Sequence, residues 1–254
     1  MEQVIRATGL TKRFRDVRAV DGVDLTVSTG ERVALLGPNG AGKTTTLFML
    51  LGVIAPDSGH VEITGLRLPE KRSEAMQRVG FAAGYMPLAE RLRVREFLGL
   101  YGGLYGLKDP RERIELGLER FGITRLGQVM GNELSSGQRT LVGIIKATLH
   151  SPRLLVLDEP TASLDPDVAQ RVRQGLQDLC EKEGTTLLVT SHNMVEVARL
   201  CDRVIFMSAG RVVADGTPDE VAGSFGQEDL EDVFLHIAGT GGGVGRDQET
   251  DHTA

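Results

Sequence analysis

The residues best suited to chemistry lie together in one short segment, Gly37-Pro38-Asn39-Gly40-Ala41-Gly42-Lys43-Thr44, with Thr45 directly after it. The segment matches the phosphate-binding pattern G-x-x-x-x-G-K-[ST] at every fixed position. Glycines let the backbone N–H groups turn toward a phosphate, and the N-terminus of a following helix adds positive potential. In such a loop Lys43 reaches the terminal phosphates and Thr44 holds Mg²⁺. We therefore predict a nucleotide site here, the alternative being a glycine-rich turn without a ligand.

A second group of candidate residues is a pair of carboxylates, Asp158 and Glu159, which follows the apolar run Leu154–Leu157. Such a continuous run is typical of a buried parallel strand. A carboxylate at its end, Asp158, can hold a metal ion or its water shell. Because side chains alternate along a strand, we expect Glu159 to point to the other side, where it could act as a general base on a water molecule. The alternative is an acidic loop, which the phosphate-binding pattern upstream makes less attractive.

These residues need a sheet and helices to hold them. Hydrophobic patterning predicts an edge strand over 4–8, a loop, and a strand over 23–27. The phosphate loop is expected between a strand at 31–36 and a helix at 45–51. Further strands are predicted over 60–64, 79–83, 154–157, 186–190, 204–207 and 211–214, the last two as a hairpin. Helices are predicted over 69–78, 166–183, 193–200, 219–222 and 229–237.

Between residues 86 and 150 the strand patterns stop and three helices are predicted, over 94–105, 110–121 and 138–149. Phe97, Tyr101 and Tyr105 recur every four residues, so they share one helix face. All three tyrosines of the chain, including Tyr85, fall in this segment. The aromatic face is either the core of a helical subdomain or a docking surface for a partner, and buried stripes are the commoner case.

Composition excludes several classes of function. The chain has 254 residues, is 41% hydrophobic and 25% charged, and carries a net charge of −6 without a basic stripe. This argues for a globular protein whose main partner is not nucleic acid. Cys180 and Cys201 lack metal-ligand or redox spacing, as expected of reduced thiols in a cytosolic protein. No apolar run approaches the ~20 residues that span a bilayer, so any work at a membrane requires another chain.

Five residues then point to a family. Leu134-Ser135-Ser136-Gly137-Gln138 resembles the LSGGQ signature of ABC-type ATPases, and it precedes the Asp158–Glu159 strand as in that family. Ser163-Leu164-Asp165 resembles the loop after that strand, and Thr190-Ser191-His192 resembles the switch histidine at the end of the next one. Phe14 stands where the family has its base-stacking aromatic residue. The resemblance covers residues 4 to 237.

The resemblance implies ATP and Mg²⁺ as ligands and a head-to-tail dimer with a second copy or a paralogous ATPase subunit. ATP would bind between the phosphate loop of one subunit and residues 135–138 of the other. Asp165 would help to organise the dimer interface, and His192 would contact the γ-phosphate and orient the water. Locally, Ser135 or Ser136 could also cap the helix that follows. A separate integral-membrane permease would hold the dimer at the inner face of the cell membrane, and residues 84–105 are the candidate groove for it.

Two positions depart from the family pattern. Ser136 replaces the usual Gly, which should matter little because serine is small and can cap a helix. Counted without gaps from Leu92, Gly84 falls where the family has a Gln that contacts Mg²⁺ and the water, so hydrolysis could be slower here or linked differently to the permease.

The segment 230–235, LEDVFL, resembles the ending of ATPase subunits of bacterial exporters and favours export over import.

The sequence thus predicts an α/β P-loop NTPase (RecA-like) core with an N-terminal antiparallel β part and an inserted helical subdomain at about 86–150. We expect a single domain over 1–237 and a disordered tail over 238–254. The predicted function is that of the ATP-binding and hydrolysing subunit of an ABC transporter. The alternative is a nucleotide-gated interaction protein that barely hydrolyses ATP. A cytosolic relative in DNA repair or translation fits less well, since such proteins usually carry two cassettes or a long coiled coil.

Overall fold

The structure, a computed structural model, describes residues 2–84, 88–162 and 164–241. Its central element is a six-stranded sheet with the strand order β10-β9-β3-β8-β7-β6. All neighbouring strands are parallel except the antiparallel pair β9 and β10. The strands are β3 (Arg32–Leu36), β6 (Val79–Ala83), β7 (Leu154–Asp158), β8 (Thr186–Thr190), β9 (Arg203–Ser208) and β10 (Arg211–Gly216).

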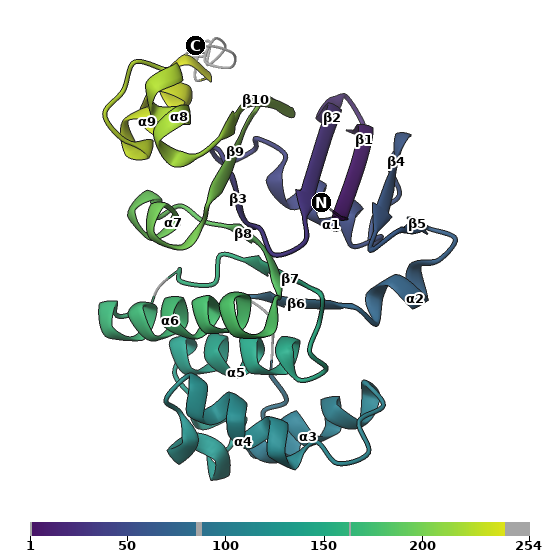
Figure 1. Cartoon of the computed structure of the whole chain (residues 1–254), viewed down its shortest axis with the longest axis vertical. Coiled ribbons are helices and arrows are strands. Elements are labelled where there is room, and N and C mark those ends of the chain that lie inside the picture. Colours follow the sequence, from purple (N-terminus) through teal and green to yellow (C-terminus); the bar gives the residue numbers. More distant parts are fainter. Residues whose placement is uncertain (1, 85–87, 163, 242–254) are drawn as a thin grey trace, which may run out of the picture.

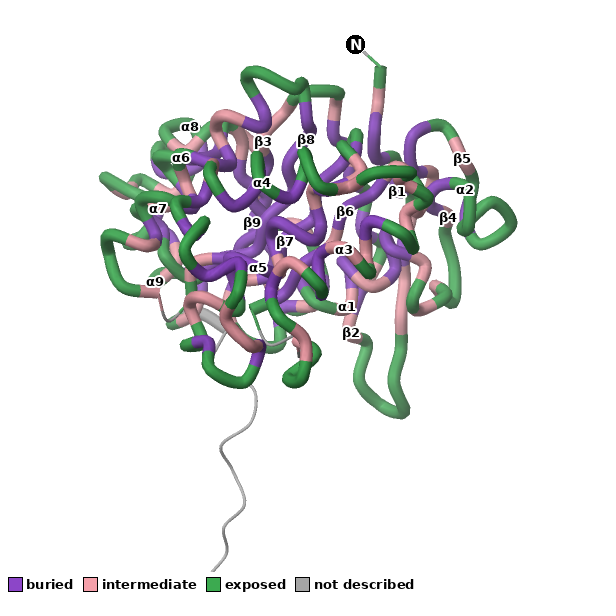
Figure 2. The backbone as a smooth tube through the Cα atoms, turned by 90° about the horizontal axis from the view of Figure 1, so that it is seen from below, coloured by how far each residue is buried: buried purple, intermediate pink, exposed green. Residues whose placement is uncertain are grey.

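Strands β3, β6, β7, β8 and β9 are almost entirely buried, which explains why they are continuous apolar runs rather than alternating ones, whereas the edge strand β10 is partly exposed. In β7, Leu154 and Val156 face the side that carries α1 (Lys43–Leu50), whereas Leu155 and Leu157 face the helical side. Figure 2 shows these strands as a buried band inside an exposed shell. Because the inner strands are covered on both faces, their polar groups become accessible only at the strand ends.

The second sheet is antiparallel, with the order β2-β1-β4-β5, and packs against α1. Its strands are β1 (Gln3–Phe14), β2 (Val17–Ser28), β4 (Ser58–Ile63) and the unpredicted β5 (Leu66–Leu68). Residues 4–8 lie in a strand as predicted, but its edge position and the loop after it are wrong, since β1 lies between β2 and β4 and the strand pair runs up to Phe14 and Val17. Backbone pairing continues through the polar tip of this hairpin, where hydrophobic alternation gives no sign of a strand.

Helices α3 (Val94–Leu104), α4 (Arg111–Arg120) and α5 (Ser136–Thr148) lie together. They are at the end of the molecule opposite α8 (Pro218–Ser224) and α9 (Leu230–Gly241) (Figure 1). Short 3₁₀ turns at Thr124–Gln128 and Gly131–Glu133 join α4 to α5. The aromatic face of α3 packs inward: Phe97 is buried, and the ring centroids of Phe97 and Tyr101 are 4.9 Å apart. These contacts favour the core interpretation of the stripe. Tyr85 lies outside the described residues.

The remaining helices pack around the central sheet or form the C-terminal part of the described chain. They are α2 (Arg72–Met76), α6 (Pro166–Glu183), α7 (Met194–Leu200), α8 (Pro218–Ser224) and α9 (Leu230–Gly241). Helix α9 passes the predicted helix end at 237, so residues 238–241 are helical and not part of a tail, while 242–254 lie outside the described residues. Within the described ranges, none of the helices has the length and apolar character needed to cross a membrane.

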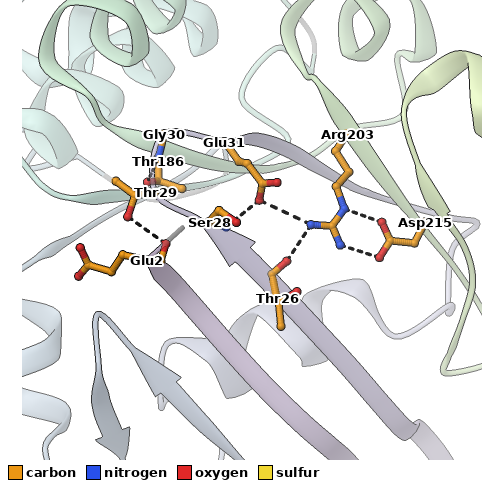
Figure 3. Close-up of polar contacts among 9 residues, drawn as sticks. All are labelled: Glu2, Thr26, Ser28, Thr29, Gly30, Glu31, Thr186, Arg203 and Asp215. Atoms are coloured by element: carbon orange, nitrogen blue, oxygen red, sulfur yellow. Dashed lines mark hydrogen bonds and ion pairs between the residues drawn. The ribbon is translucent and has the colours of Figure 1, made fainter.

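A polar network joins the two sheets close to the strand that leads into the phosphate loop (Figure 3). Arg203 of β9 donates to both carboxylate oxygens of Asp215 on β10, at 2.6 and 2.7 Å, and to the Thr26 carbonyl oxygen of β2 at 3.0 Å. Its guanidinium also lies 3.5 Å from Glu31, whose carboxylate accepts from the Ser28 N–H group. The turn before β3 is thereby fixed, and with it the start of the strand that presents the phosphate loop.

Candidate nucleotide site

The predicted phosphate loop runs from the end of β3 to the start of α1 and depends on its glycines for space. Gly37 has φ +140°, and a Cβ atom there would lie 2.1 Å from the Met207 carbonyl oxygen. Gly42 has φ +100°, and its Cβ atom would lie 2.3 Å from the Ala19 carbonyl oxygen. Both positions therefore require glycine for conformation and for close approach of the backbone. The loop is held between β9 and the hairpin of β1 and β2.

Lys43, the first residue of α1, is buried inside this loop. Its ammonium group donates to the carbonyl oxygens of Gly37 at 2.6 Å and Pro38 at 3.1 Å. Burial lowers the pKa of Lys43, while the nearby charges of Glu159 and Asp158 act in the opposite direction. A cation held in this way, next to backbone N–H groups and the N-terminus of a helix, suits a phosphate group.

The loop forms one wall of a cavity of about 390 Å³, in the size range of small-molecule sites. Both carboxylates predicted from the sequence line it, together with the predicted histidine. The lining residues are Val17, Ala19, Asn39, Gly40, Ala41, Gly42, Lys43, Thr44, Thr45, Asp158, Glu159 and His192. Residues from four separate parts of the chain thus meet at the carboxyl ends of β3, β7 and β8, the usual place for a ligand in a parallel sheet.

Asp158, the last residue of β7, is buried at the base of this cavity. It shares the α1 side of the sheet with Leu154 and Val156 because side chains alternate along the strand. The Thr190 hydroxyl, on the neighbouring strand β8, donates to its carboxylate at 2.6 Å. Sequence reasoning quoted Thr190 only as part of the histidine motif and missed this role, although both residues end neighbouring buried strands.

Thr44 and Asp158 fit the Mg²⁺ ion that the sequence predicts, since both bring oxygen atoms to the cavity that holds Lys43. Among the described residues there is no cluster of three or more His, Cys, Asp or Glu side chains that could enclose a metal. Mg²⁺ in nucleotide sites is usually held by one or two protein groups plus the phosphates themselves. Thr44 and Asp158 are therefore enough protein ligands for this ion.

Glu159 lines the same cavity as Asp158. The prediction from side-chain alternation, that Glu159 points to the opposite side of the strand, is therefore wrong. The reason is its backbone: Glu159 follows the last residue of β7 and has φ +53°, a left-handed conformation that is rare for residues other than glycine. Its N–H group donates to the carbonyl and hydroxyl oxygens of Thr190 at 3.2 and 3.1 Å. Backbone strain of this kind often accompanies functional sites.

The carboxylate of Glu159 is bound to His192 through two contacts. Nε2 of the imidazole lies 3.0 Å from one oxygen, and the His192 backbone N–H group donates to the other at 3.2 Å. Burial raises the pKa of Glu159, and the charge and N–H group of His192 and the charge of Lys43 partly oppose this. The pair thus combines a carboxylate of raised basicity with a ring that can hold its orientation.

The other predicted residues lie apart from this cavity. Ser135 precedes α5, and its hydroxyl accepts from the Gln138 N–H group at 3.3 Å in a reciprocal capping box. Ser135 and Ser136 are exposed, and none of the described cavity-lining residues belongs to 135–138. Asp165 is an exposed residue at the start of α6. Ser163 lies outside the described residues.

Phe14 is 45% exposed at the end of β1 and does not line the cavity, whereas Val17 and Ala19 of the same hairpin do. Sequence reasoning missed both of these small residues because it placed them in a loop. The Lys12 ammonium lies 5.7 Å from the Phe14 ring centroid. The base-stacking role of Phe14 stays a prediction.

Gly84, the position of the expected Gln, follows β6 and lies beside the backbone of Asp158 and Glu159. Its N–H group donates to the Asp158 carbonyl oxygen at 3.2 Å, and a Cβ atom there would lie 3.3 Å from the Glu159 carbonyl oxygen. A side chain at this position would therefore start next to Glu159.

The parallel sheet, the glycine-rich loop around a lysine, and the carboxylates beyond β7 together define a P-loop nucleoside triphosphatase. Comparison with known proteins is more specific. The model of the ABC transporter family matches residues 20–162, more than half of the chain. The chain belongs to the ABC transporter family, which confirms the resemblance found in the sequence and implies ATP binding.

Two relatives illustrate the similarity. The chain is 36% identical over 239 residues to the probable multidrug ABC transporter ATP-binding protein YbhF of Escherichia coli, covering 93% of this chain but 41% of that longer protein. It is 39% identical over 209 residues to the Nod factor export ATP-binding protein I of Burkholderia lata, covering 82% of this chain and 68% of the relative.

Solved structures confirm the predicted fold class. An ATP-binding subunit of an ABC transporter superposes with a TM-score of 0.84 at 28% identity, covering 92% of this chain and 99% of that one. A bacterial ABC transporter cassette solved as a dimer gives a TM-score of 0.76 at 27% identity, with 84% and 98% covered.

Proposed function

We propose that this chain binds and hydrolyses ATP as one of two cassettes that power an ABC transporter through a separate membrane permease. The observation that carries the proposal is the cavity in which Lys43, Asp158, Glu159 and His192 meet around a phosphate loop. Such a constellation can bind a nucleotide, neutralise its phosphates and position a water molecule.

Each residue then has a separate role in the reaction. Lys43 and the loop N–H groups bind the β- and γ-phosphates, and Thr44 and Asp158 hold Mg²⁺, which when bound spreads the developing charge. Glu159 accepts a hydrogen bond from the attacking water and takes its proton as the water oxygen bonds to the γ-phosphorus. The bond to the ADP oxygen breaks in the same transfer. His192 keeps the Glu159 carboxylate in place through its 3.0 Å contact and lies where it can reach the γ-phosphate.

The second half of the site comes from another cassette. Ser135 and the first N–H groups of α5 open a 13-residue helix toward solvent, away from the phosphate loop of the same chain. A helix N-terminus is suited to a γ-phosphate. A head-to-tail dimer with a second copy or a paralogue supplies residues 135–138 in trans, with Asp165 near the interface. The dimeric cassette of similar fold supports this arrangement.

Export is the favoured direction of transport. Relatives covering most of this chain carry names that refer to multidrug transport, Nod factor export and daunorubicin resistance. The permease is then a separate integral-membrane protein, and the cassette is peripheral at the inner face of the cell membrane. Neither the charge of −6 nor the site suggests a nucleic-acid partner.

A second candidate function is favoured by Gly84. Without a side chain beside Glu159, the chain could close on ATP and hold a partner while hydrolysing slowly. The two functions share the binding site and differ in turnover.

The proposal is tested with Glu159→Gln, which keeps the shape of the side chain and removes its basicity. We expect this variant to bind ATP and to elute as a dimer with ATP but as a monomer with ADP, measured by size exclusion with light scattering. Lys43→Ala is the control, because loss of the cation should abolish ATP binding and the dimer. A Glu159→Gln variant that remains monomeric in ATP would contradict the shared site.

A further inference from the structure

The last described helix, α9, reaches the site from the C-terminal part of the chain. Its Phe234 ring meets the His192 ring edge-on, with centroids 6.5 Å apart and an angle of 82° between the planes. We propose that Phe234 is a positioning residue that holds His192 against Glu159, so that α9 is part of the hydrolytic machinery. This inference rests on the proposed function for the roles of His192 and Glu159.

The His192 ring has few constraints of its own. Its side chain is 46% exposed, and it stands in the short turn between β8 and α7. The turn itself is fixed, since the Ser191 hydroxyl accepts from the Asn193 N–H group and the Asn193 side chain caps α7. Among the described residues, the ring has Glu159 as its ion-pair partner and Phe234 as its aromatic neighbour. The backbone is therefore ordered, while the ring depends on these two side chains.

Phe234 is held firmly enough to serve as such a support. Leu230, Val233 and Ile237 lie on one face of α9 and are at most 4% exposed, so they anchor the helix to the core. The Asp229 carboxylate accepts from the first N–H groups of the helix at 2.9 and 3.0 Å and fixes where it begins. The anchored face thus determines the place of Phe234, the residue directly after Val233.

Open space beside the pair makes this support necessary. A cavity of about 640 Å³ adjoins the nucleotide cavity and is bordered by Glu159, His192 and Phe234. His192 lines both cavities. Without Phe234 the imidazole would have room to rotate into the larger cavity and lose its contact with Glu159. Aromatic pairs at 4.5–7 Å contribute enough to favour one orientation about threefold to tenfold.

The test is Phe234→Ala, with Leu235→Ala as the matched control, because Leu235 is the next residue of α9, is 62% exposed and lines the same larger cavity. We expect kcat for ATP to fall about threefold to tenfold in Phe234→Ala, with the ATP Kd unchanged. Phe234→Tyr should restore kcat and Leu235→Ala should keep it. In a His192→Ala background, Phe234→Ala should cause no further loss.

A second readout does not depend on turnover. The ring ¹H–¹³C signal of His192, assigned by its loss in His192→Ala, should shift in Phe234→Ala and stay in place in Leu235→Ala. If the wild type hydrolyses ATP while Phe234→Ala keeps full kcat, the inference is wrong although the proposed function stands. A His192 signal that does not respond to Phe234→Ala would overturn it even where the wild type proves inactive.

Discussion

At the scale of single residues, the site depends on one strained position. Glu159 adopts a left-handed backbone conformation, which turns its carboxylate into the cavity that Asp158 already lines. Two carboxylates and a buried lysine then share one small space, and burial raises the pKa of Glu159. Raised basicity is what a general base needs near neutral pH.

This arrangement predicts a trade-off between stability and activity at Glu159. A carboxyl group whose pKa is raised by folding stabilises the folded state below that pKa and loses this contribution as pH rises through it. Above the raised pKa the ionised group therefore costs stability, and Glu159→Gln should raise Tm at neutral pH. Calorimetry at several pH values checks this, and the gain should shrink as pH falls through the raised pKa of Glu159. A lower Tm for the variant at neutral pH would contradict the assigned cause.

Gly84 gives a second prediction at this scale. Its N–H group binds the Asp158 carbonyl oxygen, and a Cβ atom would fit at 3.3 Å from Glu159 with a small adjustment. Gly84→Gln should therefore fold normally and change kcat severalfold, if its amide contacts the metal and the water as the resemblance to ABC ATPases implies. Steady-state ATPase assays of this variant beside Gly84→Ala distinguish the effect of the side-chain amide on kcat from the effect of an added carbon atom. Equal kcat for both variants and the wild type would count against the gap-free alignment of this position.

At the level of secondary structure, the start of α5 caps its helix, and we propose that it also binds the nucleotide of a partner cassette. Ser135 forms a capping box with Gln138, and Thr217 forms the same box with Glu220 at the start of α8, far from the cavity. Each serine or threonine cap should contribute about 1 kcal/mol to stability. Ser135→Ala and Thr217→Ala should thus lower the free energy of unfolding similarly in urea titrations.

The two cap variants should differ in turnover, because only Ser135 faces the γ-phosphate of a partner cassette in the proposed dimer. We expect a clear drop of kcat in Ser135→Ala and none in Thr217→Ala. If both variants lose kcat in proportion to stability, Ser135 is a cap and nothing more.

The elements also show how far the sequence could predict the structure. Helix α6 and strands β6 and β8 occur within the predicted bounds, because continuous apolar runs and a proline at the first helical position are strong local signals. Strand β1 is longer than the predicted strand over 4–8, because its polar tip is defined by cross-strand backbone pairing. The predicted orientation of the Glu159 side chain is wrong for a related reason. The left-handed backbone conformation of this one residue ends the alternation, and a glutamate side chain does not indicate such a conformation. Tertiary contacts such as Phe234 with His192 have no local pattern at all.

At the scale of the whole molecule, the account requires two chains for each site. Lys43→Ala removes the phosphate loop of a site and Ser135→Arg blocks the signature, so each variant alone should be inactive. In an equal mixture turnover should return, because a mixed dimer has one site whose phosphate loop and signature are both intact, whereas neither variant alone forms such a site. An ATPase assay of the mixture checks this, and a mixture as inactive as its components would contradict a site shared in trans.

Hydrolysis of ATP at the cavity of Lys43, Asp158 and Glu159 can be measured as steady-state ATP turnover of the purified chain. The assay compares wild type and Glu159→Gln, each with and without Mg²⁺. The account predicts Mg²⁺-dependent turnover in the wild type and its loss in Glu159→Gln, with ATP binding retained. Normal turnover in Glu159→Gln would contradict the assignment of the base, and ATP binding without turnover in the wild type would favour the nucleotide-gated binder.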